Sequence, residues 1–238
     1  MVGSLLAKAG IALCKALHKT GPQVMGQEIA DIVEKHSIGA AVSGLGSAWI
    51  PGVGGAAATA AAIGFVWSMY VRINALIGMP FSKNILKSVA TAICTNVASY
   101  AVAAIALSTV FSLLPGIGSV GASLTMAIVA FSITWSAGLV YLKVLTRFAQ
   151  SDVDLNDVGE EDLKAMAQDV LAKENVKKMM KQAKEEFKAA KARGAIRKGA
   201  KEIALEEKIP RRSKSGSSAK RTAPTKSKAS TRSRRSKK

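Results

Sequence analysis

The sequence predicts an all-α protein, in which a multi-span helical membrane domain of two Pro-Gly-tipped helical hairpins is followed by a cytoplasmic helical segment and a disordered basic tail. Three observations lead to this class. Charged residues occur in blocks, two long runs contain no charged side chain, and one phrase is written twice, as IPGVGG at 50–55 and as LPGIGS at 114–119.

The net charge of +18 is distributed very unevenly along the 238 residues. Residues 1–151 carry nine Lys or Arg and three acids, residues 152–208 carry thirteen of each, and residues 209–238 carry twelve bases and no acid. Such different compositions predict separate regions. We expect amphipathic N-terminal helices over 1–36, a hydrophobic membrane domain over 37–148, a charged amphipathic helical segment over 152–208 and a disordered Lys/Arg/Ser-rich tail over 209–238.

The longer run without charge extends from Ser88 to Leu142 and is interrupted at Pro115-Gly116. Its two parts, Ser88–Leu114 and Ile117–Leu142, would each form a helix about 40 Å long. That length is enough to cross a hydrocarbon core of about 30 Å with some tilt. The run therefore predicts two membrane-spanning helices.

The shorter run, Ser37–Val71, divides less evenly. Val53–Val71 is a minimal span, and Ser37–Ile50 is too short to cross, so we expect it to form a shallow or re-entrant arm. A helix that is apolar all round lies either in lipid or deep inside a protein. Membrane insertion is favoured over a soluble bundle because a chain of this size has little protein with which to bury two such helices.

Each repeated phrase predicts the tip of a helical hairpin. Proline lacks the amide hydrogen that a helix interior requires, and glycine permits a tight reversal of the chain. The residues expected at the two tips are Pro51, Gly52, Gly54, Pro115, Gly116 and Gly118.

Small and polar residues are expected to pack the helices together. Ala56, Ala60, Gly64 and Ser68 are four apart, a spacing that lets backbones approach closely in lipid, although an alanine-rich composition alone gives the same pattern. Asn96 is strongly polar within an apolar run. We expect it to hydrogen-bond between helices rather than to line a polar path.

Basic residues flank the longer run on both sides. Arg72, Lys83 and Lys87 precede it, and Lys143 and Arg147 follow it. The positive-inside rule places both flanks in the cytoplasm and the second tip outside. We therefore expect a membrane location, in the bacterial inner (plasma) membrane, with the C-terminus in the cytoplasm.

The start of the charged segment resembles a calcium loop only superficially. Asp152, Asp154 and Asn156 alternate as in an EF-hand, but Asp157 and Leu163 stand where that loop needs glycine and glutamate. No metal site is therefore expected. Asp157 instead predicts a helix N-cap, because an acidic residue follows three positions later.

An apolar stripe at helical spacing continues from Leu163 to Ala190, and Gly194 and Gly199 are expected to interrupt it. The stripe either binds a partner, self-associates as a coiled coil, or packs on the chain's own domain. A homo-oligomer is accordingly one expectation.

The C-terminal tail contains no aromatic residue and cannot bury a core, so it is expected to be disordered. Its positive charge predicts binding to anionic lipid or, without reading of sequence, to nucleic acid. The residues expected to bind polyanions are Arg211, Arg212, Lys214, Lys220, Arg221, Lys226, Lys228, Arg232, Arg234, Arg235, Lys237 and Lys238.

The order of motifs over residues 38–148 resembles the YcjF-type, GTPase-associated membrane domain of unknown function. The shared features are the two Pro-Gly turns, an apolar helix that ends near Arg72, and the connector Gly78-Met79-Pro80-Phe81-Ser82-Lys83. The resemblance implies a membrane-embedded helical domain, often fused to or encoded beside a small GTPase, which for this chain could only be a separate partner. The chain departs from a fused arrangement because it contains no phosphate-binding G-x-x-x-x-G-K-[ST] motif.

Taken together, these features predict a non-enzymatic scaffold, anchor or partner subunit in a lipid bilayer, with no cofactor. Two alternatives stay open, namely a pore-forming or membrane-perturbing helical assembly and a membrane-tethered, non-specific nucleic-acid binder. Cys14 and Cys94 form no metal-binding pattern, and His18 and His36 lack a recognisable catalytic partner in the sequence.

Overall fold

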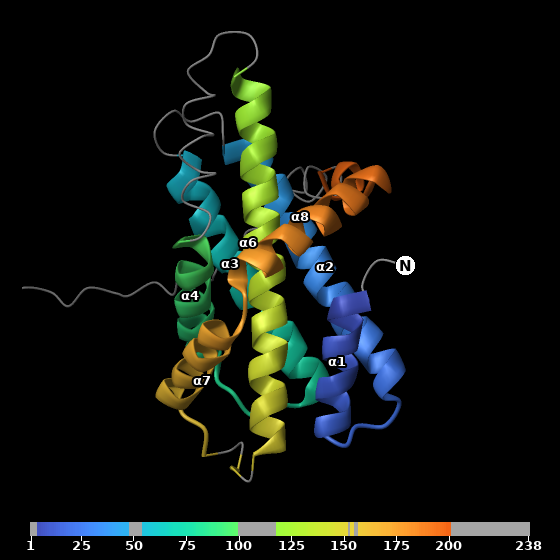
Figure 1. Ribbon diagram of the computed structural model, residues 1–238, viewed down its shortest axis with the longest axis vertical. Helices are drawn as coiled ribbons and strands as arrows, with labels where there is room; N and C mark the ends of the chain where they lie inside the picture. Colours follow the sequence, from blue (N-terminus) through green and yellow to red (C-terminus); the bar gives the residue numbers. More distant parts are fainter. Residues whose placement is uncertain (1–3, 48–53, 100–117, 152, 155–156, 201–238) are drawn as a thin grey trace, which may run out of the picture.

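The computed structural model describes residues 4–47, 54–99, 118–151, 153–154 and 157–200. Every regular element within these ranges is a helix, which confirms the predicted all-α class. The helices, labelled as in Figure 1, are α1 (Ser4–Ala16), α2 (Pro22–Ser47), α3 (Gly54–Ile77), α4 (Lys83–Ser99), α6 (Gly118–Gln150), α7 (Glu160–Lys173) and α8 (Val176–Ala192).

Helix α6 forms the centre of the bundle. It is 33 residues long and contacts α1, α2, α3, α4, α7 and α8 (Figure 1). Its stretch Ser123–Gln150 is long and apolar enough to cross a membrane, yet 89% of that stretch is buried inside the protein. Ala60–Ile77 of α3 passes the same test and is only 39% buried. Protein neighbours thus cover most of α6, whereas α3 leaves much of its apolar surface uncovered.

Glycines allow the helices around α6 to approach closely. A Cβ atom on Gly10 of α1 would lie 2.7 Å from the carbonyl oxygen of Gly26 in α2. A Cβ atom on Gly44 of α2 would lie 2.8 Å from the carbonyl oxygen of Met126 in α6. Because real Cβ atoms do not come so close to backbone, these positions fix the packing of α2 between α1 and α6.

The expected boundary between residues 36 and 37 falls inside a helix. Helix α2 runs from Pro22 to Ser47 without a break, so Ser37 begins its second half and not a separate re-entrant arm. Helix α3 likewise continues past Val71 to Ile77. Both helices therefore combine a part with charged residues and a part without them.

The Pro-Gly phrases lie at the edges of the described ranges. Pro51, Gly52, Pro115 and Gly116 are outside the described residues, as is the part of the expected span Ser88–Leu114 that follows Ser99. Gly54 and Gly118 are the first residues of α3 and α6.

The connector between α3 and α4 has a clear stop and start. Gly78 adopts a left-handed backbone with a φ of 70°, which ends α3, and the Met79 amide donates to the Asn74 carbonyl at 3.0 Å. Ser82 Oγ then accepts the Ile85 amide at 3.3 Å at the start of α4. The turn is thus confined to residues 78–82.

The charged segment contains two helices with defined ends. The predicted cap at Asp157 is wrong, because α7 begins at Glu160 after Gly159, whose amide donates to the Asp162 carboxylate at 2.9 Å. Asn175 caps α8 by accepting the amide of residue 178 at 2.9 Å. Gly194, with a φ of 74°, follows α8 and confirms the interruption predicted there. The interruption predicted at Gly199 is wrong, because Gly199 lies within the helical residues 195–200.

The apolar stripe of this segment packs on the chain itself. Helix α8 contacts α6, and α7 contacts α4 and α6. Phe187 of α8 meets Phe131 of α6 edge to face, with ring centroids 5.5 Å apart. Packing on the chain's own domain is therefore the interpretation that the contacts support. The buried stripe residues are Leu163, Ala167, Val170, Leu171, Val176, Met179, Ala183, Phe187 and Ala190.

Candidate functional site

The segments without charge gather toward one end of the bundle. They are Ser37–Ser47 of α2, Gly54–Val71 of α3, Ser88–Ser99 of α4 and Gly118–Leu142 of α6. In Figure 1 the end of α2 and the start of α3 lie in the upper part of the molecule, and the start of α6 rises above them. We call these four segments the charge-free end. The molecule is therefore polarised along its long axis.

Ion pairs join residues at the end of α7 and after α8 to α2 and α6, in a region that we call the charged belt. Helix α8 and the residues after it also cover part of the charge-free segments, at Phe131 of α6 and Ile38 of α2. Its ion pairs between helices are partly exposed, so each contributes at most about 1 kcal/mol, but together they fix how α7 and α8 dock. These pairs are Lys143–Glu174, Arg147–Asp169 and Glu34–Arg193.

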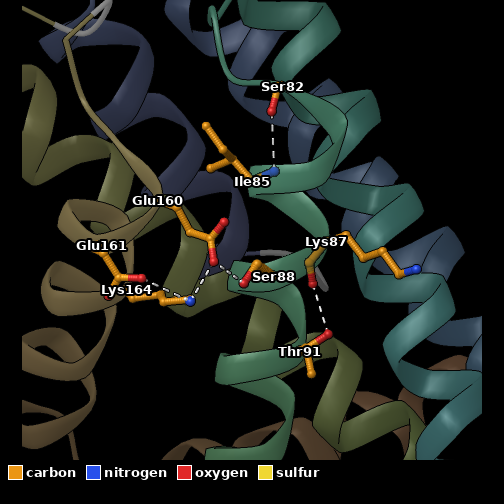
Figure 2. A network of polar contacts seen from close by, with 8 residues as sticks. All are labelled: Ser82, Ile85, Lys87, Ser88, Thr91, Glu160, Glu161 and Lys164. Carbon is orange, nitrogen blue, oxygen red and sulfur yellow. Dashed lines mark hydrogen bonds and ion pairs between the residues drawn. The ribbon is translucent and has the colours of Figure 1, made fainter.

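Figure 2 shows how the belt meets α4 at the first residue of its charge-free segment. Glu160 Oε1 accepts hydrogen bonds from Lys164 Nζ and from Ser88 Oγ, each at 2.6 Å. The hydrogen bond from Lys164, followed by that from Ser88, lowers the pKa of Glu160 and keeps the carboxylate ionised. A polar contact between α4 and α7 is thereby placed at the border of the two regions.

A buried polar layer joins the two helices that could cross a membrane. Tyr70 of α3 and Tyr141 of α6 stack with ring centroids 3.9 Å apart. The Tyr70 hydroxyl donates to the Ala137 carbonyl at 2.9 Å, and the Tyr141 hydroxyl donates to Asn74 Oδ1 at 2.6 Å. We call Tyr70, Asn74 and Tyr141 the tyrosine layer. It lets α3 and α6 satisfy each other's hydroxyl groups.

The interhelical amide is Asn74, not the predicted Asn96. Asn96 is exposed on α4, whereas Asn74 is 4% exposed and bonded to Tyr141. The sequence predicts that the apolar helix ends near Arg72, so Asn74 falls outside the predicted helix. Tyr70 and Asn74 are four positions apart, so they share a face of α3, and that spacing is the signal that could have found them.

The predicted small-residue face of α3 is open among the described residues. Ala60 is exposed, and a Cβ atom on Gly64 would meet nothing within 4 Å. Ser68 lines a cleft. Ala56 lies in α3 outside the side chains that the structure describes. The close helix contacts involve other glycines, at positions 10, 26 and 44.

The predicted polyanion-binding residues, from Arg211 to Lys238, all lie outside the described residues. Within the described ranges, no group of three or more His, Cys, Asp or Glu side chains is arranged to hold a metal ion.

Comparisons with protein-family models, with curated proteins and with solved structures found no match for this chain. The YcjF-type resemblance thus stays a prediction. Function is inferred below from the polarity and the contacts of the bundle itself.

Proposed function

We propose that the protein is a non-enzymatic integral membrane protein that acts as a scaffold, an anchor or a partner subunit. Its charge-free end lies in lipid and its charged belt lies in water, on the cytoplasmic side of an inner membrane. The observation that supports this proposal is the absence of Asp, Glu, Lys and Arg from the charge-free segments of four neighbouring helices. A single charge at the centre of a bilayer costs about 2.5–3.5 kcal/mol or more, so insertion requires such segregation.

The position of α8 limits how deeply α6 inserts in the packed state. Helix α8 covers α6 at Phe131, whose ring meets that of Phe187. Residues 118–130 rise about 20 Å, which is less than a hydrocarbon core of about 30 Å. Residues 118–142 rise about 37 Å, which is enough. The packed bundle therefore enters the membrane only through the part of its charge-free end that α8 and the residues after it leave uncovered, and a full crossing by α6 requires α8 to move away.

Membrane extraction tests the proposal. The full chain and a form without residues 209–238 are expressed, and the membranes are washed with high salt and then with alkaline carbonate. Both forms should stay in the pellet, because apolar burial and not tail charge holds them there. Release of the full chain by high salt contradicts insertion.

A charge placed on α3 provides a matched control. Ala60 and Ala75 are both exposed, but only Ala60 lies in the charge-free end. Ala60→Lys should lower the carbonate-resistant fraction, and Ala75→Lys should leave it unchanged. Equal behaviour of the two variants would show that the charge-free end is not in lipid.

A membrane-perturbing assembly is the second candidate function. It is favoured by α6, an apolar helix that is mostly buried beneath helices carrying the charged belt. Departure of α7 and α8 would expose that helix to lipid. Liposome leakage tests this candidate, and protein that inserts well without causing leakage would remove it.

From the sequence we further propose that residues 209–238 bind anionic lipid, with nucleic acid as the alternative ligand. If deletion of residues 211–238 leaves nucleic-acid retention at moderate salt unchanged, the nucleic-acid alternative fails. A separate small GTPase as partner is proposed on the YcjF-type resemblance alone.

A further inference from the structure

An open cleft of about 650 Å³ lies between α2, α3 and the helical residues that follow α8. Lys35 of α2, Arg72 of α3 and Lys198 contribute its positive charge, and no acidic residue is among the residues that line it. Within the described ranges, none of these three cations forms an ion pair. We call this feature the cationic cleft. It presents uncompensated positive charge on a concave surface.

Apolar residues form the remainder of the wall. Ile38 of α2 and Ala61 and Phe65 of α3 line the cleft. Gly64 also lines it and leaves open space where a side chain would stand. From Arg72 to Ala61 the wall rises about 16 Å along α3. The cleft therefore joins a cationic region to an apolar wall.

The direction of the cleft matches the polarity of the bundle. Lys35 and Arg72 stand just outside the charge-free segments of α2 and α3, and the antiparallel course of these helices brings them to one level (Figure 1). The apolar wall extends from that level into the charge-free end. A ligand in this cleft would thus have its anionic group at the membrane border and its apolar part toward the membrane interior.

We propose that the cationic cleft binds one anionic phospholipid, with the headgroup phosphate at Lys35, Arg72 and Lys198 and an acyl chain against Ile38 and Phe65. Basic pockets between helices at the cytoplasmic side of a membrane suit anionic headgroups, and guanidinium groups bind phosphate with paired hydrogen bonds. The volume is typical of a small-ligand site. The apolar wall selects a lipid over free phosphate, which would leave that wall unused. This proposal rests on the proposed membrane association.

His36 provides a local probe of the cleft. It lines the cleft, and its Nδ1 lies 2.7 Å from the Ile32 carbonyl oxygen. Burial lowers the pKa of His36, the Ile32 hydrogen bond opposes this effect, and the charges of Arg72 and Lys35 lower the pKa further. An anion bound beside these cations should raise that pKa. His18, the other histidine of the chain, is exposed and serves as the internal reference.

The experiment measures binding of short-chain lipids to the full chain in uncharged detergent, by nuclear magnetic resonance of the two histidines. Dihexanoyl-phosphatidylglycerol should bind saturably and raise the pKa of His36, while the resonances of His18 stay unchanged. Dihexanoyl-phosphatidylcholine and glycerol phosphate should each bind at least about tenfold more weakly, because the first lacks net negative charge and the second lacks the acyl chain. Equal binding of the two lipids would overturn the proposal. Glycerol phosphate binding as tightly as the anionic lipid would make the cleft a phosphate site and would overturn the lipid assignment.

Variants test the two parts of the cleft separately. Lys35→Gln with Arg72→Gln should weaken binding of the anionic lipid about thirtyfold, from about 1 kcal/mol for each base. The control removes two exposed cations of α8, as Lys177→Gln with Lys181→Gln, and should leave the affinity unchanged. Every variant keeps the same tail, so tail binding cancels in the comparison. An unchanged affinity in the cleft variant contradicts the proposal.

The apolar wall is tested by filling it. Gly64→Leu should weaken lipid binding about tenfold without affecting glycerol phosphate, because its side chain would occupy the place of the acyl chain. Ala60→Leu adds comparable bulk one turn away, outside the cleft, and should have no effect. If both variants bind lipid like the parent protein, the wall takes no part. Because the assay uses micelles, it reports on the cleft even if membrane extraction refutes the proposed function.

Discussion

Truncation of Phe187 tests how firmly α8 is fastened to α6. The ring is 2% exposed and packs edge to face against Phe131 at 5.5 Å. Replacing a buried phenylalanine by alanine costs about 3–5 kcal/mol, of which an aromatic pair accounts for about 0.5–1.5 kcal/mol. Phe187→Ala should therefore destabilise the docking of α8 by about 4 kcal/mol.

Hydrogen exchange followed by mass spectrometry measures this loss region by region. A change of about 4 kcal/mol should reduce amide protection in Val176–Ala192 by roughly 10³-fold, with a smaller change in α3. Val24→Ala is the control, because Val24 is 76% exposed and its truncation should change stability by less than about 0.5 kcal/mol. A loss of protection smaller than about tenfold in Phe187→Ala would refute the burial of this ring against α6 and, with it, the limit that α8 sets on insertion.

Three further predictions concern single contacts. The pKa of Glu160 is lowered, first by its lysine and then by its serine partner, so its contribution to stability is present at neutral pH and is lost as pH falls below its ordinary value of 4.5. Glu160→Gln should therefore reduce the difference between the melting midpoints at about pH 7 and about pH 3. An undiminished difference would contradict this prediction. Gly44→Ala should lower the free energy of unfolding by about 1–3 kcal/mol, because its Cβ meets the backbone of α6. Gly64→Ala should raise the free energy of unfolding by about 0.5–1 kcal/mol, because the space there is open and alanine favours the helix. Thermal melts compare the two variants with the parent protein. Tyr141→Phe should cost about 1–3 kcal/mol in urea unfolding by leaving the Oδ1 of buried Asn74 without its donor, and a neutral effect would show that this hydrogen bond contributes nothing.

Local patterns predicted the helices but not their partners. The all-α class follows from long apolar runs and helical spacing, and the interruption at Gly194 follows from the freedom of glycine to adopt a positive φ. The helical spacing of the apolar residues from Leu163 to Ala190 likewise predicts that they share one face. The spacing does not say whether another protein or α6 covers that face, and the contact of Phe187 with Phe131 links residues far apart in the sequence.

The candidate sites depend even more on tertiary structure. Lys35 and Arg72 lie on different helices, and only the antiparallel course of α2 and α3 brings them to one cleft. Asn96 looked like an interhelical residue because its neighbours are apolar. The face of α4 on which Asn96 lies does not follow from composition. In the structure the interhelical hydrogen bond is made by Asn74, which follows Arg72 on α3.

The hydroxyl groups of α6 have a consequence for its surroundings. Thr134 and Thr146 donate to carbonyl groups of their own helix, at Ala130 and Leu142, and Tyr141 donates to α3 through the tyrosine layer. None of these three bonds depends on α1, α2, α7 or α8. The pair of α3 and α6 can therefore exchange its protein neighbours for hydrocarbon without leaving any of these three hydroxyls unpaired. Ser136 is the contrast, because its hydroxyl donates to Met180 Sδ of α8 at 3.7 Å and would lose that partner when α8 leaves.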